Sequence, residues 1–253
     1  MDNSTLVTFF LPGNETTKYQ FRFSLEWLIF LSILYTLTTL FTVAGNILVI
    51  LVFVRGRHSR TDLRPYLINL AVADLIMAVF CMPFTFGDAV FRSWIFTEPL
   101  CPIVIFMQTL SVAASVFINV AIGIDRFLVV TFPLMSKGSK SRTKFVIATI
   151  WVFSLAVSLV VVPVARVQKV GINNVACNEF WPDITHKQVY TMAIFLLTYA
   201  IPLIILTISY SVVGFLLWKR TSPGNRDHVR DLLQLKSKIK VRDISTFKTN
   251  SIF

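Results

Sequence analysis

Residues that could carry out chemistry are scarce in this 253-residue sequence. It contains three cysteines and three histidines, but no CxxC pair or Cys/His cluster has the spacing of a metal site. The histidines stand far apart between apolar runs, and no nucleophile is paired with a base. These residue types predict neither an enzyme nor a metalloprotein. The most informative polar residue is Asp74, a carboxylate inside a long apolar run.

Five apolar runs indicate what kind of molecule must hold these residues. Hydrophobic residues make up 55% of the chain and charged residues only 15%, too few to cover a soluble domain of this length. Each run reaches the roughly 20 residues that a helix needs to cross a bilayer. In membrane strands, apolar and polar residues alternate with a period of two, and these runs show no such alternation. We therefore expect five transmembrane helices, at about 27–54, 65–88, 99–126, 145–165 and 188–218.

Basic residues give the predicted helices an orientation. Lys and Arg number 18 on one side of the spans and 6 on the other, so the positive-inside rule places the N-terminus outside. Residues 1–26 then form an extracellular segment, with glycosylation sequons at Asn3 and Asn14. Residues 219–253 form a basic cytoplasmic tail. Because this topology accounts for the net charge of +11, we expect no nucleic-acid partner.

Two acidic positions stand out once the spans are placed. Asp74 falls in mid-membrane, where a carboxylate costs about 2.5–3.5 kcal/mol and is functional by default. The alternative is a tolerated Asp that is protonated or hydrated. Asp125 precedes Arg126 at the cytoplasmic end of the third span. An ordinary interfacial ion pair, with Arg126 reaching toward lipid phosphates, would also explain this second position.

Short motifs follow one another along the predicted spans. They are Gly45-Asn46, Asn69-Leu-Ala-Val-Ala-Asp74, Trp94 before Cys101, Asp125-Arg126-Phe127, Trp151, and Pro202 with Tyr210. In this order the motifs resemble those of the rhodopsin-like (class A) G-protein-coupled receptors, over residues 27 to about 241. The resemblance implies an all-α membrane protein that contains helices 1–5 of a seven-transmembrane receptor bundle. Phe127 departs from the family, which more commonly has Tyr at this position.

The resemblance also assigns roles to individual residues. It implies a sodium ion bound by Asp74 and Ser115, with Asn46 nearby in the same polar network; no other cofactor is expected. It implies a disulfide between Cys101 and Cys177. It further implies that Asp125 and Arg126 restrain the inactive state, and that Arg126 later contacts a heterotrimeric G protein, with Tyr210 in the same coupling region.

Ligand preference can be inferred from the outer half of the chain. Counting back from Arg126 places Gln108 at the ligand-facing position of the third helix, where amine receptors of the family have Asp; an amine ligand is therefore disfavoured. The loop 177–183 resembles that of receptors in the neuropeptide FF, neuropeptide Y and tachykinin groups. Glu179 and Asp183 could meet a basic peptide end, such as an Arg-aromatic-amide terminus. The alternative for these two carboxylates is a solvated acidic loop.

Family character fades after about Val241. Residues 242–253 contain three charges and no apolar run, so we expect no sixth span there. An alternative exon, a frameshift or a prematurely ended gene model would each explain this pattern. We expect a neuropeptide-type receptor of the plasma membrane whose own signalling is in question. The alternative is a non-signalling isoform that binds the full-length receptor and retains it inside the cell. A transporter or channel would show repeated halves or broken helices, which the sequence lacks.

Overall fold

The computed structural model describes residues 6–10, 16–20, 24–56, 63–91, 93–132, 140–170 and 174–221. Five helical stretches in these residues are long and apolar enough to cross a membrane, which confirms the predicted fold class. The chain forms two units, Met1–Tyr210 and Ser211–Phe253. The helices are α1 (Leu25–Arg55), α2 (Arg64–Phe80), α3 (Met82–Phe91), α4 (Leu100–Thr131), α5 (Lys140–Leu159), α6 (Ile184–Phe195), the π-helical turn η1 (Leu196–Ala200) and α7 (Ile201–Thr221).

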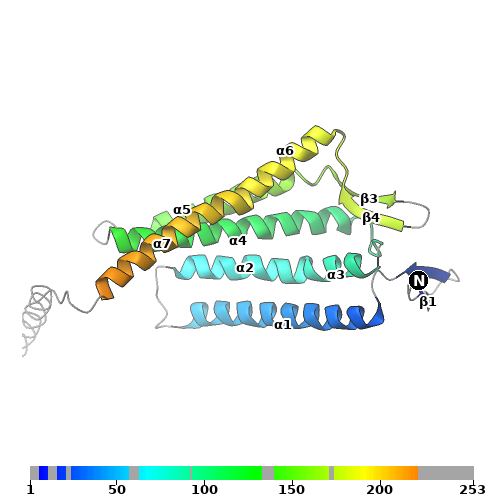
Figure 1. Ribbon diagram of the computed structural model, residues 1–253, viewed down its shortest axis with the longest axis horizontal. Coiled ribbons are helices and arrows are strands. Elements are labelled where there is room, and N and C mark those ends of the chain that lie inside the picture. The colour runs from blue at the N-terminus through cyan, green and yellow to red at the C-terminus, as the bar shows by residue number, and fades with distance from the viewer. Residues whose placement is uncertain are drawn as a thin grey trace, which may run out of the picture. The chain divides into compact units, whose positions relative to one another are not determined.

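The helix α4 is the centre of the first unit. It packs against α2 and α5, and α2 packs in turn against α1 (Figure 1). Many of the buried residues of α4 are small, among them Ser111, Ala113 and Gly123. Small side chains let membrane helices approach closely, and dispersion contacts then hold them together. Tyr66 and Ile150 add to this centre from the neighbouring helices α2 and α5.

Two of the five spans are interrupted, and a proline explains each interruption. The span expected as one helix at 65–88 is instead α2 followed by α3, with a break at Cys81. Pro83 lacks a backbone N–H and its ring crowds the preceding turn, so the helical ladder cannot run through it unchanged. In the last span, Ile201 N–H donates to Leu196 O and forms a π turn immediately before Pro202.

The fourth span is displaced from its expected range of 145–165. The helix α5 covers Lys140–Leu159, and Ala165 already belongs to a strand. The expected range began after the last basic residue and therefore left out the basic first turn of the helix. Long basic side chains can belong to such a turn, because they reach the membrane interface from it. The third span, α4, likewise extends past the expected end at 126 to Thr131.

Two short hairpins were not foreseen by the all-helical prediction. The strand β1 (Leu6–Phe10) pairs antiparallel with β2 (Thr16–Gln20), and β3 (Ala165–Val170) pairs antiparallel with β4 (Asn174–Glu179). In the second hairpin Val167 lies opposite Cys177. Both hairpins lie outside the apolar spans. The predicted sequons at Asn3 and Asn14, and the predicted basic tail from residue 222 onward, lie outside the described residues.

Candidate functional site

A disulfide joins the β3–β4 hairpin to the beginning of α4. Cys101, in the first turn of α4, is bonded to Cys177 of β4, which confirms the expected pairing. Cys101 is completely buried and belongs to a cluster with Trp94 and Val104. Val167 of β3 packs against the same cluster. The hairpin is therefore fixed to the helix by a covalent bond and by a small apolar core.

A second attachment of this hairpin lies two residues before the disulfide. Val175 N–H donates to Ser93 Oγ at 3.2 Å, and the Ser93 hydroxyl in turn donates to Val175 O at 3.3 Å. Trp94 N–H donates to the same carbonyl at 2.6 Å. No sequence pattern indicates this role for Ser93, because it depends on where the hairpin bends back. Both backbone groups of Val175 are thus bound to the segment between α3 and α4.

The two predicted acidic ligand residues each have a partner within the chain. Trp181 Nε1–H donates to Glu179 Oε2 at 3.0 Å, and the Trp181 ring lies 5.0 Å from that of Tyr190. Asp183 is exposed, and its Oδ1 accepts from Thr185 N at 3.0 Å, which caps the start of α6. Each carboxylate thus accepts one hydrogen bond within the chain, and Asp183 does so while it remains exposed. Both lie at the same end of the bundle as the disulfide (Figure 1).

Gln108 lies on an exposed position of α4 and lines a cavity of about 370 Å³. Residues from α1, α2 and α3 complete the wall, among them Tyr35, Met77 and Thr85. Among the described residues, no recorded hydrogen bond joins Gln108 to Glu179 or to the cap residue of α6. The structure thus places Gln108 in a cavity between helices and leaves the acidic pair on the hairpin side.

The predicted polar network is assembled in part. Ser115 Oγ donates to Asp74 Oδ1 at 3.0 Å and so links α4 to α2. Asn46 Nδ2 instead donates to Thr42 O of its own helix at 2.9 Å, and no hydrogen bond to Asp74 is recorded in the described part of the chain. Carboxylate and hydroxyl oxygens are the ligands that hard cations prefer, so this pair fits a sodium ion. Within the described ranges, no group of three His, Cys, Asp or Glu residues could hold a metal.

A further polar contact crosses the middle of the bundle. Trp151 Nε1–H of α5 donates to Asn69 Oδ1 of α2 at 2.9 Å. Both residues belong to the motifs noted in the sequence, but their pairing was not predicted. Hydrogen bonds of this kind link transmembrane helices that would otherwise be held by dispersion alone.

The opposite end of α4 carries the predicted coupling residues. Arg126 Nη2 lies 2.8 Å from Asp125 Oδ2, an ion pair between sequence neighbours. Arg126 Nε is buried and has no hydrogen-bond partner among the described residues. Tyr210 of α7 is half exposed and lies over Gly123, together with Leu206. The three predicted residues Asp125, Arg126 and Tyr210 therefore all lie at the same end of α4.

Comparison with known proteins agrees with this geometry. Residues 45–247 match the family described as 7 transmembrane receptor (rhodopsin family). The chain is 33% identical over 197 residues to neuropeptide FF receptor 2 of Mus musculus, covering 73% of this chain and 47% of that protein. It is 30% identical over 218 residues to the RYamide receptor of Drosophila melanogaster, covering 82% and 46%.

Neuropeptide receptor 22 of Caenorhabditis elegans is 30% identical over 202 residues, covering 75% of this chain and 46% of that protein. The chain thus spans about half the length of these relatives. Proteins of this family are receptors and not enzymes, and the apolar helices agree with a multi-pass membrane protein. The chain belongs to the rhodopsin family of seven-transmembrane receptors.

Proposed function

We propose that this chain forms the ligand-binding part of a plasma-membrane receptor for a neuropeptide. The observation that carries the proposal is the similarity, across most of the chain, to relatives named for neuropeptide ligands. The doubly attached β3–β4 hairpin supports it, because a fixed hairpin at the mouth of a bundle presents its side chains in one geometry. The N-terminus and this hairpin face outward in the proposed topology.

The acidic residues near the hairpin give the ligand its proposed chemistry. Glu179 is half-buried and oriented by Trp181, and Asp183 is exposed at the start of α6. A peptide that ends in a basic residue, an aromatic residue and an amide would place its cation near these carboxylates. Gln108, in its cavity, supplies a neutral amide that can hydrogen-bond to the uncharged terminus.

Binding of a radiolabelled peptide ending in Arg-Phe-amide tests this proposal. The chain is expressed in membranes together with a fragment of neuropeptide FF receptor 2 that supplies two further spans. We expect specific binding, and we expect Glu179→Gln and Asp183→Asn each to weaken it by roughly threefold to tenfold. Asn is as good a helix cap as Asp, so Asp183→Asn removes the charge without unfolding the start of α6.

The matched control is Glu98→Gln, which removes an exposed carboxylate from the segment before α4. This variant should bind the peptide as tightly as the unchanged chain does. Absence of specific binding would contradict a peptide ligand. Binding that both hairpin substitutions leave unchanged would contradict the assignment of Glu179 and Asp183.

The opposite end of the bundle would engage a heterotrimeric G protein. In this proposal Asp125 holds Arg126 in the resting state through their 2.8 Å contact, and Arg126 is then released toward the G protein, with Tyr210 beside it. The unpartnered Nε of Arg126 is a donor available for a new contact. A sodium ion held at Asp74 and Ser115 would stabilise the resting arrangement between α2 and α4.

A second candidate function is association with an intact receptor, which would be held back from the cell surface. The supporting observation is α1, whose 31 residues include none that are buried. A long apolar helix that contacts α2 but has no fully buried residue can pack against another bundle. Co-expression distinguishes the two functions: a retaining partner lowers the surface density of neuropeptide FF receptor 2, and unchanged surface density contradicts this second candidate.

A further inference from the structure

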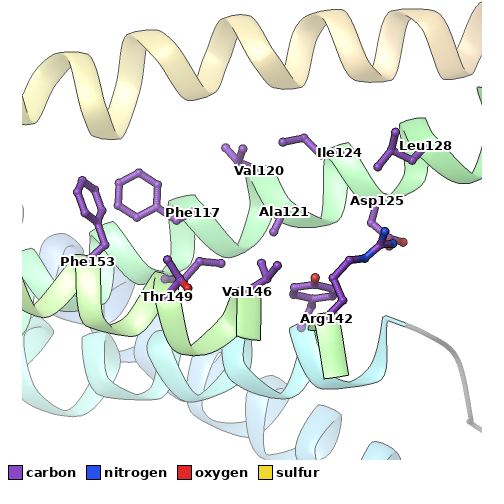
Figure 2. A pocket seen from close by; sticks show the side chains of 12 residues that line it. Phe117, Val120, Ala121, Ile124, Asp125, Leu128, Arg142, Val146, Thr149 and Phe153 are labelled. Carbon is purple, nitrogen blue, oxygen red and sulfur yellow. The ribbon is translucent and has the colours of Figure 1, made fainter. Parts of the chain in front are cut away.

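A groove of about 490 Å³ runs between α4 and α5, away from the hairpin (Figure 2). Its walls are apolar along most of their length, with Val120 and Ile124 on α4 and Val146 on α5. Only one end is polar, where Asp125 and Arg142 lie (Figure 2). Of these residues, only Asp125 has a part in the function proposed above. The groove itself has no role there.

The length of the groove matches one leaflet of a bilayer. Phe117 and Phe153 pack edge to face at its apolar end, with ring centroids 5.3 Å apart. From Phe117 to Leu128 the rise of the α-helix gives a length of about 16 Å. Half of a typical hydrocarbon core is about 15 Å. The groove thus extends from the membrane interface to about the bilayer midplane.

The form and lining of the groove suit one extended hydrocarbon chain. The groove is elongated and its walls are apolar along most of their length. The methylene groups of an extended acyl chain would contact Val120, Ile124 and Val146 along these walls. We therefore take a lipid tail as the occupant.

The polar end of the groove carries positive charge. Arg142 and Lys144 are exposed in the first turns of α5, which contain no acidic residue. The structure records an ion pair for Arg126 but none for Arg142 among the described residues. Asp125 lies at the same end, but its carboxylate is paired with Arg126. The start of a helix also carries partial positive charge and favours anions. An anion at the mouth of the groove would therefore be attracted by both Arg142 and the start of α5.

We infer that this groove binds an anionic phospholipid, with one acyl chain between α4 and α5 and the phosphate at Arg142. The charge of the mouth favours an anionic lipid over a neutral one, and the apolar walls hold the chain by dispersion. The predicted orientation places this end in the cytoplasmic leaflet, where anionic lipids are concentrated. The site is separate from the hairpin and does not depend on the ligand proposed above.

Photolabelling of the purified full chain in nanodiscs tests this inference. Either phosphatidylserine or phosphatidylcholine carries the same photoreactive acyl chain, and labelled peptides are mapped by mass spectrometry. Labelling of α1 serves as the internal standard for general lipid contact. We expect phosphatidylserine to label the groove several-fold more than phosphatidylcholine does. Arg142→Gln should lower this preference about fivefold, which corresponds to about 1 kcal/mol for one basic residue near an anionic surface.

Further variants separate the charge from the shape of the site. Arg142→Lys keeps the charge and should retain the preference for phosphatidylserine. Thr149→Phe places a ring in the groove and should reduce its labelling by both lipids, whereas Val152→Phe on the exposed side of the same helix should not. Equal labelling of the groove by the two lipids would overturn the inference. So would a preference that survives Arg142→Gln, or a groove whose labelling Thr149→Phe leaves unchanged.

Discussion

Asp74 has one recorded hydrogen-bond partner in the bundle, the hydroxyl of Ser115. An ionised carboxylate can accept several hydrogen bonds, so one donor leaves most of its acceptor capacity for a cation or for water. A carboxylate at membrane depth is costly unless such groups surround it. At this scale the pair Asp74 and Ser115 is therefore a small oxygen-lined site that should respond to sodium.

We expect sodium chloride to raise the thermal unfolding midpoint of the purified chain relative to choline chloride at equal ionic strength. Binding to the folded state alone stabilises it by about 1.4 kcal/mol when the ion is at ten times its Kd. Asp74→Asn should abolish the difference between the salts, and Ser115→Ala should reduce it. Ser111→Ala, one turn away on α4, should preserve it. A sodium effect that persists in Asp74→Asn would place the ion elsewhere.

Residue-level prediction succeeded where the family resemblance assigned a covalent pair and failed where it depended on a rotamer. Cys101 and Cys177 are paired as expected. The hydrogen bond of Asn46 to its own helix depends on a side-chain torsion that no sequence pattern encodes. The capping role of Asp183 could have been predicted, because Asp preceding a helical run is a common N-cap.

At the scale of elements, the contact between α4 and the first part of α7 depends on the absence of a side chain at Gly123. A Cβ there would lie 2.8 Å from Leu206 Cδ2 and 4.0 Å from Tyr210 Cζ. Since the nearer atom is the end of a flexible side chain, a single methyl group can be accommodated by a small shift. A larger side chain would have to separate the two helices.

We expect Gly123→Leu to destabilise the bundle by about 1–3 kcal/mol, the range for overpacking an existing contact. Gly123→Ala should cost much less, because Leu206 can move. Thermal unfolding in detergent measures both. Gly45→Leu is the matched control, since nothing lies within 4 Å of a Cβ at that position of α1. Equal losses at positions 45 and 123 would contradict the packing role of Gly123.

The elements themselves were predictable to the extent that hydrophobicity defines them. Five apolar runs in the sequence correspond to five apolar helical stretches. The break at Cys81 was missed although Pro83 is visible in the sequence, because membrane helices can also tolerate a proline within an apolar run. The β3–β4 hairpin was missed because its strands are short and mixed in character, and its position depends on a disulfide and on Ser93.

At the scale of the whole molecule, one covalent bond connects distant parts of the sequence. The disulfide closes a loop with a sequence separation of 76 residues, which contains most of α4 and all of α5. Reducing the entropy of the unfolded chain over such a loop stabilises the folded state by about 4 kcal/mol in the chain-entropy model. This bond is therefore expected to contribute a large share of the stability of the outer end.

We expect Cys177→Ser to lower the thermal unfolding midpoint of the purified chain by roughly 10 °C. The control is Cys81→Ser, which removes a buried thiol that forms no disulfide. That change should have a smaller effect on the midpoint. The same unfolding curve with and without a reducing agent checks the assignment independently. If reduction leaves the midpoint of the unchanged chain where it was, the disulfide is not a major source of stability.

The double attachment of the β3–β4 hairpin has a consequence for the kinetics of recognition. A loop held only at its ends would sample many conformations, and a ligand would have to select or order one of them on arrival. Because Cys177 and Val175 are both anchored, that loss of freedom occurs when the chain folds and before any encounter. Weakening the second anchor with Ser93→Ala, which leaves the Trp94 N–H bond to Val175 O in place, would return part of this entropy to the unbound loop. Association would then slow even where every contact with the ligand is retained.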